Sequence, residues 1–186
     1  MTRNFRRRRA VVRGMSPRQT LLAIAAAAAA VWALWPASPA GAQACTVPAF
    51  RYRHGIVSFT ERGATTNVRV EIADTEQTRE IGLMCRHALD PDAGMLFVFE
   101  DLTRAPFWMK NTLIPLSIAF LDNRWHVVGL DDMRVAANPA DPPPSDLWAP
   151  AKAYRYALEV NQGFFKTHDL DNKAQVRFTS GEPPKP

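Results

Sequence analysis

Apolar and polar residues alternate along several short stretches of this chain, a pattern typical of half-buried β-strands. Val68, Val70 and Ile72 alternate with charged residues, and 154–160 alternates in the same way. Short apolar runs elsewhere are bounded by turn residues, and two of them flank 122–124, which predicts a hairpin. Together these patterns predict strands at 68–72, 94–99, 116–121, 125–130, 154–160 and 174–179.

Two short segments have helical patterns instead. Asp74 is a suitable N-cap and Gln77 follows at capping-box spacing, so a helix is predicted from there to about Cys85. A second helix is predicted from about Asn161 to His168. Several strands with two short helices predict a mainly β domain, on the border of α+β, that forms either a compact small barrel or a strongly bent antiparallel sheet.

Charge is distributed unevenly along the chain, whose formal net charge is +5. Residues 1–44 hold seven of the 23 basic residues and no acidic residue. Residues 45–186 hold the other 16 basic residues against all 18 acidic ones, a net charge of −2. The basicity therefore belongs to the leader, and no nucleic-acid partner is expected for the rest of the chain.

The leader has the pattern of a secretory signal peptide. Its arginines precede an apolar stretch at 21–35, shorter than the roughly 20 residues a membrane span needs. Small residues precede a cleavage position after Ala44, so the mature protein is expected in the periplasm or outside the cell, without a membrane span. The arginine run fits a twin-arginine signal as well as the general secretory route. Lipid anchoring at Cys45 is the lesser alternative, because Ala42 stands where a lipoprotein has a larger apolar residue.

The mature chain would consist of one β-rich domain with short additions. The predicted divisions are a signal peptide at 1–44, an extension with a first strand at 45–66, the domain at 67–180 and a proline-rich tail at 181–186. The segment 138–150 contains five prolines and is predicted to be a surface loop.

Cys45 and Cys85 are the only cysteines of the chain. In an oxidising compartment an even pair suggests a disulfide. Alternatively, Cys45 lies at a mobile terminus and Cys85 is a small buried apolar residue. The sequence leaves both possibilities open.

Few residues point to catalysis. The four histidines do not pair at metal-ligand spacing, and no nucleophile elbow or phosphate loop is present, so no metal or cofactor is expected. Asp131, Asp132 and Glu159 supply the one enzymatic hypothesis, an acid–base pair of a hydrolase acting on cell-wall or exported glycans. Solvated acids at strand ends are the simpler interpretation.

The stretch 107–116 places Lys110, Asn111 and a threonine between two apolar runs. Such polar groups suit binding of an anion or a carbohydrate. They equally suit a turn in which Asn111 is left-handed and Lys110 pairs with Glu159 or Asp131. If the stretch binds a ligand, the candidate patch consists of Trp108, Lys110, Asn111, Glu159 and Asn161.

Four motifs, at 82–84, 92–99, 107–116 and 157–164, occur in the order and spacing of the family catalogued as domain of unknown function 192. The chain resembles this family from about 68 to 178, and departs from it at 172–174, where the usual Gly-Asp is missing. The resemblance implies a compact β-rich domain, often exported in bacteria, without established activity or catalytic residues. The expected function is a periplasmic binding or accessory module for an unknown ligand or envelope protein, with the hydrolase as the alternative.

Overall fold

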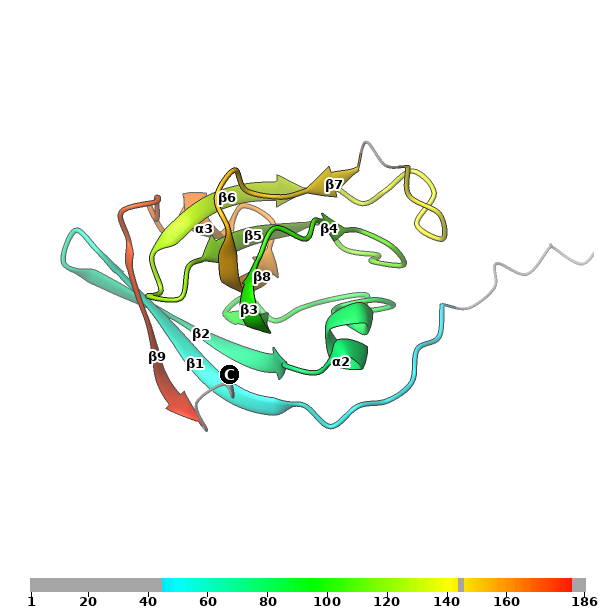
Figure 1. Ribbon diagram of the computed structural model, residues 1–186, viewed down its shortest axis with the longest axis horizontal. Coiled ribbons are helices and arrows are strands. Elements are labelled where there is room, and N and C mark those ends of the chain that lie inside the picture. The colour runs from blue at the N-terminus through cyan, green and yellow to red at the C-terminus, as the bar shows by residue number, and fades with distance from the viewer. Residues whose placement is uncertain (1–44, 144–145, 182–186) are drawn as a thin grey trace, which may run out of the picture. The chain divides into compact units, whose positions relative to one another are not determined.

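The computed structural model describes residues 45–143 and 146–181, and Figure 1 shows their arrangement. The predicted signal peptide lies outside the described residues. None of the helices in the described part has the length and apolar character needed to cross a membrane. The elements are β1 (Arg53–Glu61), β2 (Ala64–Ala73), α2 (Glu76–Ile81), β3 (Ala93–Thr103), β4 (Phe107–Trp108), β5 (Leu116–Leu121), β6 (Val127–Met133), β7 (Leu147–Trp148), β8 (Tyr154–Asn161), α3 (Phe164–Thr167) and β9 (Gln175–Gly181).

Seven strands form one curled sheet in the order β6-β5-β8-β3-β2-β1-β9, and β4 pairs with β7 in a small second sheet. The predicted mainly β class with two short helices is confirmed. The curled sheet is a half-barrel, and a single bridge between His126 and Gln175 links its edges. One pair departs from the predicted antiparallel arrangement, because β2 and β3 run parallel. Parallel neighbours need a long crossover, which 74–92 supplies and which carries α2.

Helix α2 begins one residue later than predicted and ends earlier. Its N-cap is Thr75, whose hydroxyl accepts from Thr78 N, while Thr78 Oγ1 accepts from Thr75 N. Asp74, the predicted cap, instead forms an ion pair with Arg53. The helix ends at Ile81 because Gly82 adopts a positive φ of 50°.

Helix α3 is also shorter than predicted. Asn161 still belongs to β8, and Gly163, with a φ of 79°, separates that strand from the helix. Strand β8 therefore extends one residue further than predicted, and its middle is buried on both faces instead of alternating. The proline-rich segment at 138–150 likewise contains the short strand β7.

Two hydrophobic clusters cover the two faces of the central strands. On β3, Leu96 and Val98 belong to one cluster, and Met95 and Phe97 belong to the other. Strands buried on both faces have continuous apolar runs, which explains the run at 94–99. Tyr154 was predicted on the face of the other β8 tyrosine, but the β3–β8 register shifts there and Tyr154 joins the second cluster.

Strand β8 lies at the middle of the sheet, and Glu159 is directly opposite Met95 on one side and Ile118 on the other. Close approach of β3 depends on Gly94, where a Cβ atom would come within 2.5 Å of the Glu159 carbonyl oxygen. The sheet thus fixes a carboxyl group on the face of the second cluster, among apolar neighbours.

Candidate functional site

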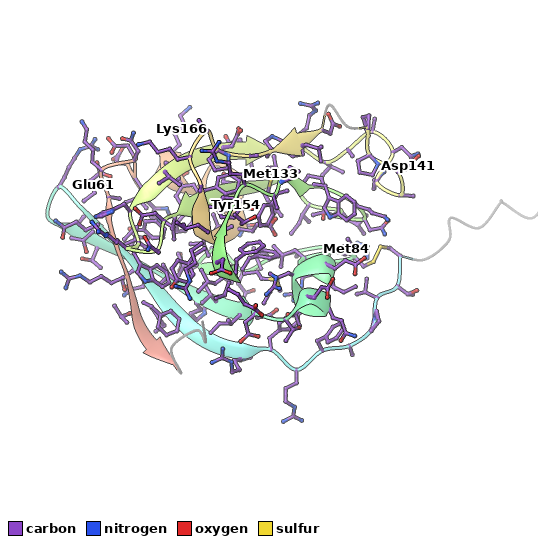
Figure 2. The ribbon with its side chains drawn as sticks, in the orientation of Figure 1. Glu61, Met84, Met133, Asp141, Tyr154 and Lys166 are labelled. Atoms are coloured by element: carbon purple, nitrogen blue, oxygen red, sulfur yellow. A yellow bond between two sulfur atoms is a disulfide. The ribbon has the colours of Figure 1, made fainter. Side chains whose placement is uncertain are left out.

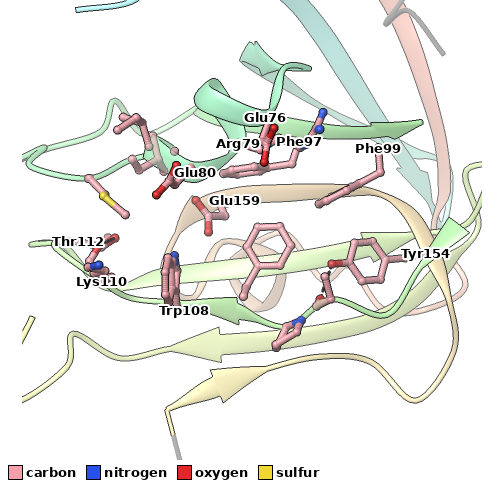
Figure 3. Close-up of a pocket in the computed structure, with 17 residues that line it drawn as sticks. Glu76, Arg79, Glu80, Phe97, Phe99, Trp108, Lys110, Thr112, Tyr154 and Glu159 are labelled. Carbon is pink, nitrogen blue, oxygen red and sulfur yellow. Dashed lines mark hydrogen bonds between the residues drawn. The ribbon is translucent and has the colours of Figure 1, made fainter. Parts of the chain in front are cut away.

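A cavity of about 220 Å³ lies between α2 and the face of the sheet that carries Glu159 (Figure 3). We call it the Glu159 cavity. Its walls are mostly apolar, and its polar side chains come from α2, from the stretch after β4 and from β8. Its lining residues include Glu76, Arg79, Glu80, Trp108, Lys110 and Glu159, together with the rings of Phe97, Phe99, Phe107 and Tyr154.

Glu159 is the most unusual residue of the cavity. Its exposed fraction is only 5%, and no described residue forms a hydrogen bond or ion pair with its carboxyl group. Burial raises the pKa of Glu159 from an ordinary 4.5 to about 8. The group is therefore an uncharged carboxylic acid at neutral pH, with one O–H donor and a carbonyl acceptor available.

Helix α2 contributes three charged side chains to the cavity. Glu76, Arg79 and Glu80 stand at i, i+3 and i+4 and therefore share one helix face. The Arg79 guanidinium is already engaged, since its Nη1 donates to Val98 O at 2.9 Å and its carbon lies 5.3 Å from the centre of the Phe99 ring. Both glutamates are exposed at the cavity mouth.

Trp108 and Lys110 form the opposite wall. Lys110 Nζ lies 5.1 Å from the centre of the Trp108 ring, a cation–π contact. The predicted ion pair of Lys110 with Glu159 or Asp131 does not form among the described residues. Trp108 keeps 43% of its surface exposed, so the wall is open to solvent at its rim.

Asn111 serves the turn with its main chain. Its φ is 52°, its N–H donates to Pro139 O at 2.7 Å, and its carbonyl accepts from Cys85 N at 2.8 Å. A left-handed conformation suits asparagine better than most residues. The Asn111 side chain is not part of the cavity lining.

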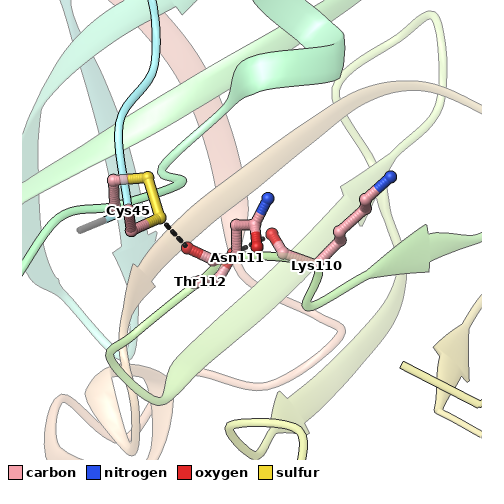
Figure 4. Close-up of a disulfide and its surroundings, with 5 residues drawn as sticks. Cys45, Lys110, Asn111 and Thr112 are labelled. Carbon is pink, nitrogen blue, oxygen red and sulfur yellow. Dashed lines mark hydrogen bonds between the residues drawn. A yellow bond between two sulfur atoms is a disulfide. The ribbon is translucent and has the colours of Figure 1, made fainter. Parts of the chain in front are cut away.

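A disulfide joins Cys45 to Cys85, with the two Cα atoms 5.3 Å apart. It lies beside Met84, a lining residue of the cavity (Figure 2). Cys45 Sγ also lies 3.7 Å from the Asn111 carbonyl oxygen (Figure 4). Because a disulfide sulfur carries no proton, this is a contact and not a hydrogen bond. The bridge therefore attaches the start of the described chain to the 110–112 turn.

Asn161 also lies outside the cavity. Its Nδ2 donates to the carbonyl oxygens of Leu89 and Asp90, at 3.1 Å and 2.9 Å. These bonds hold the loop before β3 against the end of β8. Of the five residues in the predicted patch, Trp108, Lys110 and Glu159 thus share the cavity, and the two asparagines support neighbouring turns.

The carboxylates of the hydrolase hypothesis do not share the Glu159 cavity. Asp131 and Asp132 lie on β6 and do not line the cavity. Asp132 accepts a hydrogen bond from Ser117 Oγ, which itself accepts from Gly163 N at 2.8 Å. This network connects β6, β5 and the start of α3, so Asp132 has a structural role.

The sequence did not indicate the contribution of α2 or of the rings of Phe97, Phe99, Phe107 and Tyr154. The i, i+3, i+4 spacing of the three α2 residues was visible in the sequence, but nothing indicated which surface they faced. Tyr154 was assigned to the wrong face, and its hydroxyl donates to Ala105 O at 2.5 Å. No group of three or more His, Cys, Asp or Glu side chains within 45–143 and 146–181 is arranged to hold a metal ion.

Comparison with known proteins agrees with the sequence motifs. Residues 57–178 match DUF192, a family described as an uncharacterized ACR. A structure titled as a putative transcription regulator from Sinorhizobium meliloti 1021 is 29% identical, with a TM-score of 0.61, over 70% of this chain and 98% of that one. A protein of unknown function from Novosphingobium aromaticivorans DSM 12444 is 28% identical, with a TM-score of 0.60, over 75% of this chain and 96% of that one. No curated protein matches the chain. The chain therefore belongs to the family of domain of unknown function 192.

Proposed function

We propose that this protein is an exported binding module that takes a small ligand in the Glu159 cavity. The observation that carries the proposal is the buried Glu159 carboxyl group, which has no partner among the described residues. The carboxyl group faces the cavity instead of a protein donor, so it is available to pair with a polar group of a ligand. A polar group of a ligand would supply the missing partner, while the surrounding rings would contact its apolar part.

A purely architectural role explains the cavity less well. Two other polar groups of the cavity, on Arg79 and Tyr154, already form hydrogen bonds with main-chain carbonyl oxygens. The Glu159 carboxyl group has no protein partner among the described residues, although an apolar residue at the centre of the sheet would avoid the cost of burying a carboxyl group. The hydrolase alternative has no support from the positions of Asp131 and Asp132.

A fragment screen tests the binding role directly. We expect a few small compounds to shift the amide NMR resonances of Phe97, Trp108 and Lys110 in the purified protein, because these residues line the cavity. Trp108→Ala is the test variant. Its matched control is Trp125→Ala, because Trp125 packs on the opposite face of the sheet. Trp108→Ala should weaken binding and Trp125→Ala should not. A diverse library that leaves every cavity resonance unmoved would contradict the proposal.

Export is the second part of the proposal, and two observations support it. The leader has the pattern of a signal peptide, and the Cys45–Cys85 disulfide is typical of an oxidising compartment. We expect the protein recovered from the periplasmic fraction of expressing bacteria to begin at Cys45, as measured by intact mass. A full-length chain retained in the cytoplasm would contradict it.

The description of the Sinorhizobium relative as a putative transcription regulator is not extended to this chain. Nucleic-acid binding depends strongly on basic side chains that neutralise phosphates. Residues 45–186 have a net charge of −2, and their acidic residues outnumber the basic ones.

A further inference from the structure

We infer that the ligand of the Glu159 cavity is an organic cation, with an amine or ammonium group that lies against Glu159 and an apolar body that lies against the aromatic walls. The inference rests on the proposed function and adds the chemical class of the ligand. It follows from three features of the cavity: which of its charges already have partners, what its walls consist of, and what its size admits.

The positively charged groups of the cavity already have partners in the protein, and the carboxyl groups do not. The cations Arg79 and Lys110 are both engaged, one with Val98 O and the Phe99 ring, the other with the Trp108 ring. None of the three lining carboxyl groups, on Glu76, Glu80 and Glu159, forms a hydrogen bond or an ion pair with any described residue. The cavity thus presents carboxyl groups that have no protein partner, and such groups attract positive charge and accept hydrogen bonds.

The walls are also suited to a cation. Aromatic rings attract positive groups to their faces, and this attraction grows when the pair is shielded from water. Phe99 and Trp108 already hold cationic groups of the protein itself. Phe97 and Phe107 contact each other edge to face at 5.0 Å and continue the aromatic wall. A ligand cation that reaches Glu159 would pass between these rings.

The size of the cavity limits the ligand to a compact molecule. Its volume of about 220 Å³ corresponds to roughly seven water molecules at about 30 Å³ each. The exposed side chains of Trp108 and Leu147, which are paired across β4 and β7, extend the apolar surface beyond the cavity mouth. A small aromatic amine fits this volume, whereas a polysaccharide chain or a peptide does not.

Cation binding would change the ionisation of Glu159. The ionisable groups that face it are Glu76, Arg79 and Glu80 on α2, Lys110 on the opposite wall and Tyr154 on its own strand. Its neighbours across the sheet, Met95 and Ile118, are apolar. A ligand cation beside the carboxyl group favours its charged form, so the protein releases a proton as the cation binds.

Three probes of similar size and different charge test the inference. They are benzyltrimethylammonium, whose charge does not vary with pH, the neutral benzyl alcohol and the anionic benzoate. Their dissociation constants are measured by NMR titration of the purified protein, through the cavity resonances, from pH 6 to pH 9. We expect the cation to bind at least tenfold more tightly than either comparator at pH 8. Its affinity should rise by roughly tenfold between pH 6 and pH 7 and level off near pH 9, because the pKa of Glu159 is about 8.

Two variants and a control test which side chains cause the preference for the cation and its dependence on pH. Glu159→Gln should remove both the preference for the cation and its dependence on pH. Lys110→Met should strengthen cation binding, because it removes the ammonium group that competes for the Trp108 ring. Glu100→Gln makes the same substitution at an exposed position outside the cavity and should leave both properties unchanged.

The outcomes distinguish the inference of a cationic ligand from the proposed binding role of the cavity. Binding of benzyl alcohol or benzoate in the cavity as tightly as the cation would overturn the inference and leave the binding role intact. Failure of the cation to move the cavity resonances overturns the inference as well, and a fragment screen without any cavity ligand additionally overturns the binding role. A cation that binds without dependence on pH, or equally well to Glu159→Gln, would show that Glu159 is not its partner.

Discussion

Replacing Glu159 with glutamine is expected to raise the free energy of unfolding relative to the wild type. This gain should be larger at alkaline pH than in acid, by about 5 kcal/mol. The reason is the buried position of the carboxyl group, which raises the pKa of Glu159 from 4.5 to about 8. Each unit of difference between the folded and unfolded pKa values is worth about 1.4 kcal/mol. The wild-type carboxyl group thus opposes folding wherever the unfolded chain would ionise it.

The sign follows from the number of protons bound in each state. Below pH 4.5 both the folded and the unfolded protein hold the proton, and Glu159 does not oppose folding by its charge. Between pH 4.5 and pH 8 the unfolded state loses the proton while the folded state keeps it, so stability falls as pH rises. Above pH 8 both states are ionised and the loss is complete. Glutamine does not titrate, so the variant avoids this loss.

Urea denaturation at pH 4, pH 7 and pH 9 measures the effect. The free energy of unfolding of the variant minus that of the wild type should increase between pH 4 and pH 9, with most of the change already present at pH 7. Taking this difference cancels the other titrating groups and the constant effect of burying an amide. Glu100→Gln provides the exposed control and should give a constant difference. A constant difference for Glu159→Gln would show that the folded protein holds Glu159 ionised at neutral pH.

This expectation also bears on function. Glutamate is almost never fully buried unless it is paired, and strongly shifted pKa values cluster at functional sites. Glu159 lies between Met95 and Ile118, where an apolar side chain would pack well. The loss of stability is then the consequence of keeping a carboxyl group in the cavity.

Most of the sheet could be predicted from the sequence because its signals are local. The alternation at 68–72 and the apolar run at 94–99 depend only on which faces of a strand are buried. The parallel pairing of β2 with β3 was not predictable, because it depends on where the crossover at 74–92 returns the chain. The face of Tyr154 was also missed, because the shift in register that places it depends on the partner strand.

The site was only partly predictable for a similar reason. Trp108 and Lys110 stood out because their neighbours along the chain are apolar, and Glu159 because it is a carboxylate on the alternating strand at 154–160. The glutamates and Arg79 on α2 looked like the exposed face of a helix. Only the three-dimensional structure shows that this face borders the cavity. Asn111 and Asn161 were chosen for their side chains, whereas turn geometry and loop anchoring explain both of them.

Removing the Cys45–Cys85 disulfide is expected to lower the free energy of unfolding by about 4 kcal/mol. The bridge joins residues separated by 40 positions in the sequence. In the chain-entropy account, closing a loop of this length in the unfolded state stabilises the folded protein by about that amount. The double variant Cys45→Ser, Cys85→Ser and the reduced wild-type protein should show the same loss, because both remove the bridge.

Urea denaturation with and without reductant, accompanied by thiol titration, measures this loss. The double variant is its own control, because reductant should not change its stability. Two free thiols in the protein purified without reductant, or equal stability with and without reductant, would contradict the expectation. The bridge also holds Cys85, whose N–H donates to Asn111 O, next to the turn that carries Lys110. We therefore expect its removal to broaden the NMR resonances of Met84 and Lys110 while those of the opposite core, such as Val57, stay sharp. That contrast would show that the disulfide completes the cavity as well as stabilising the fold.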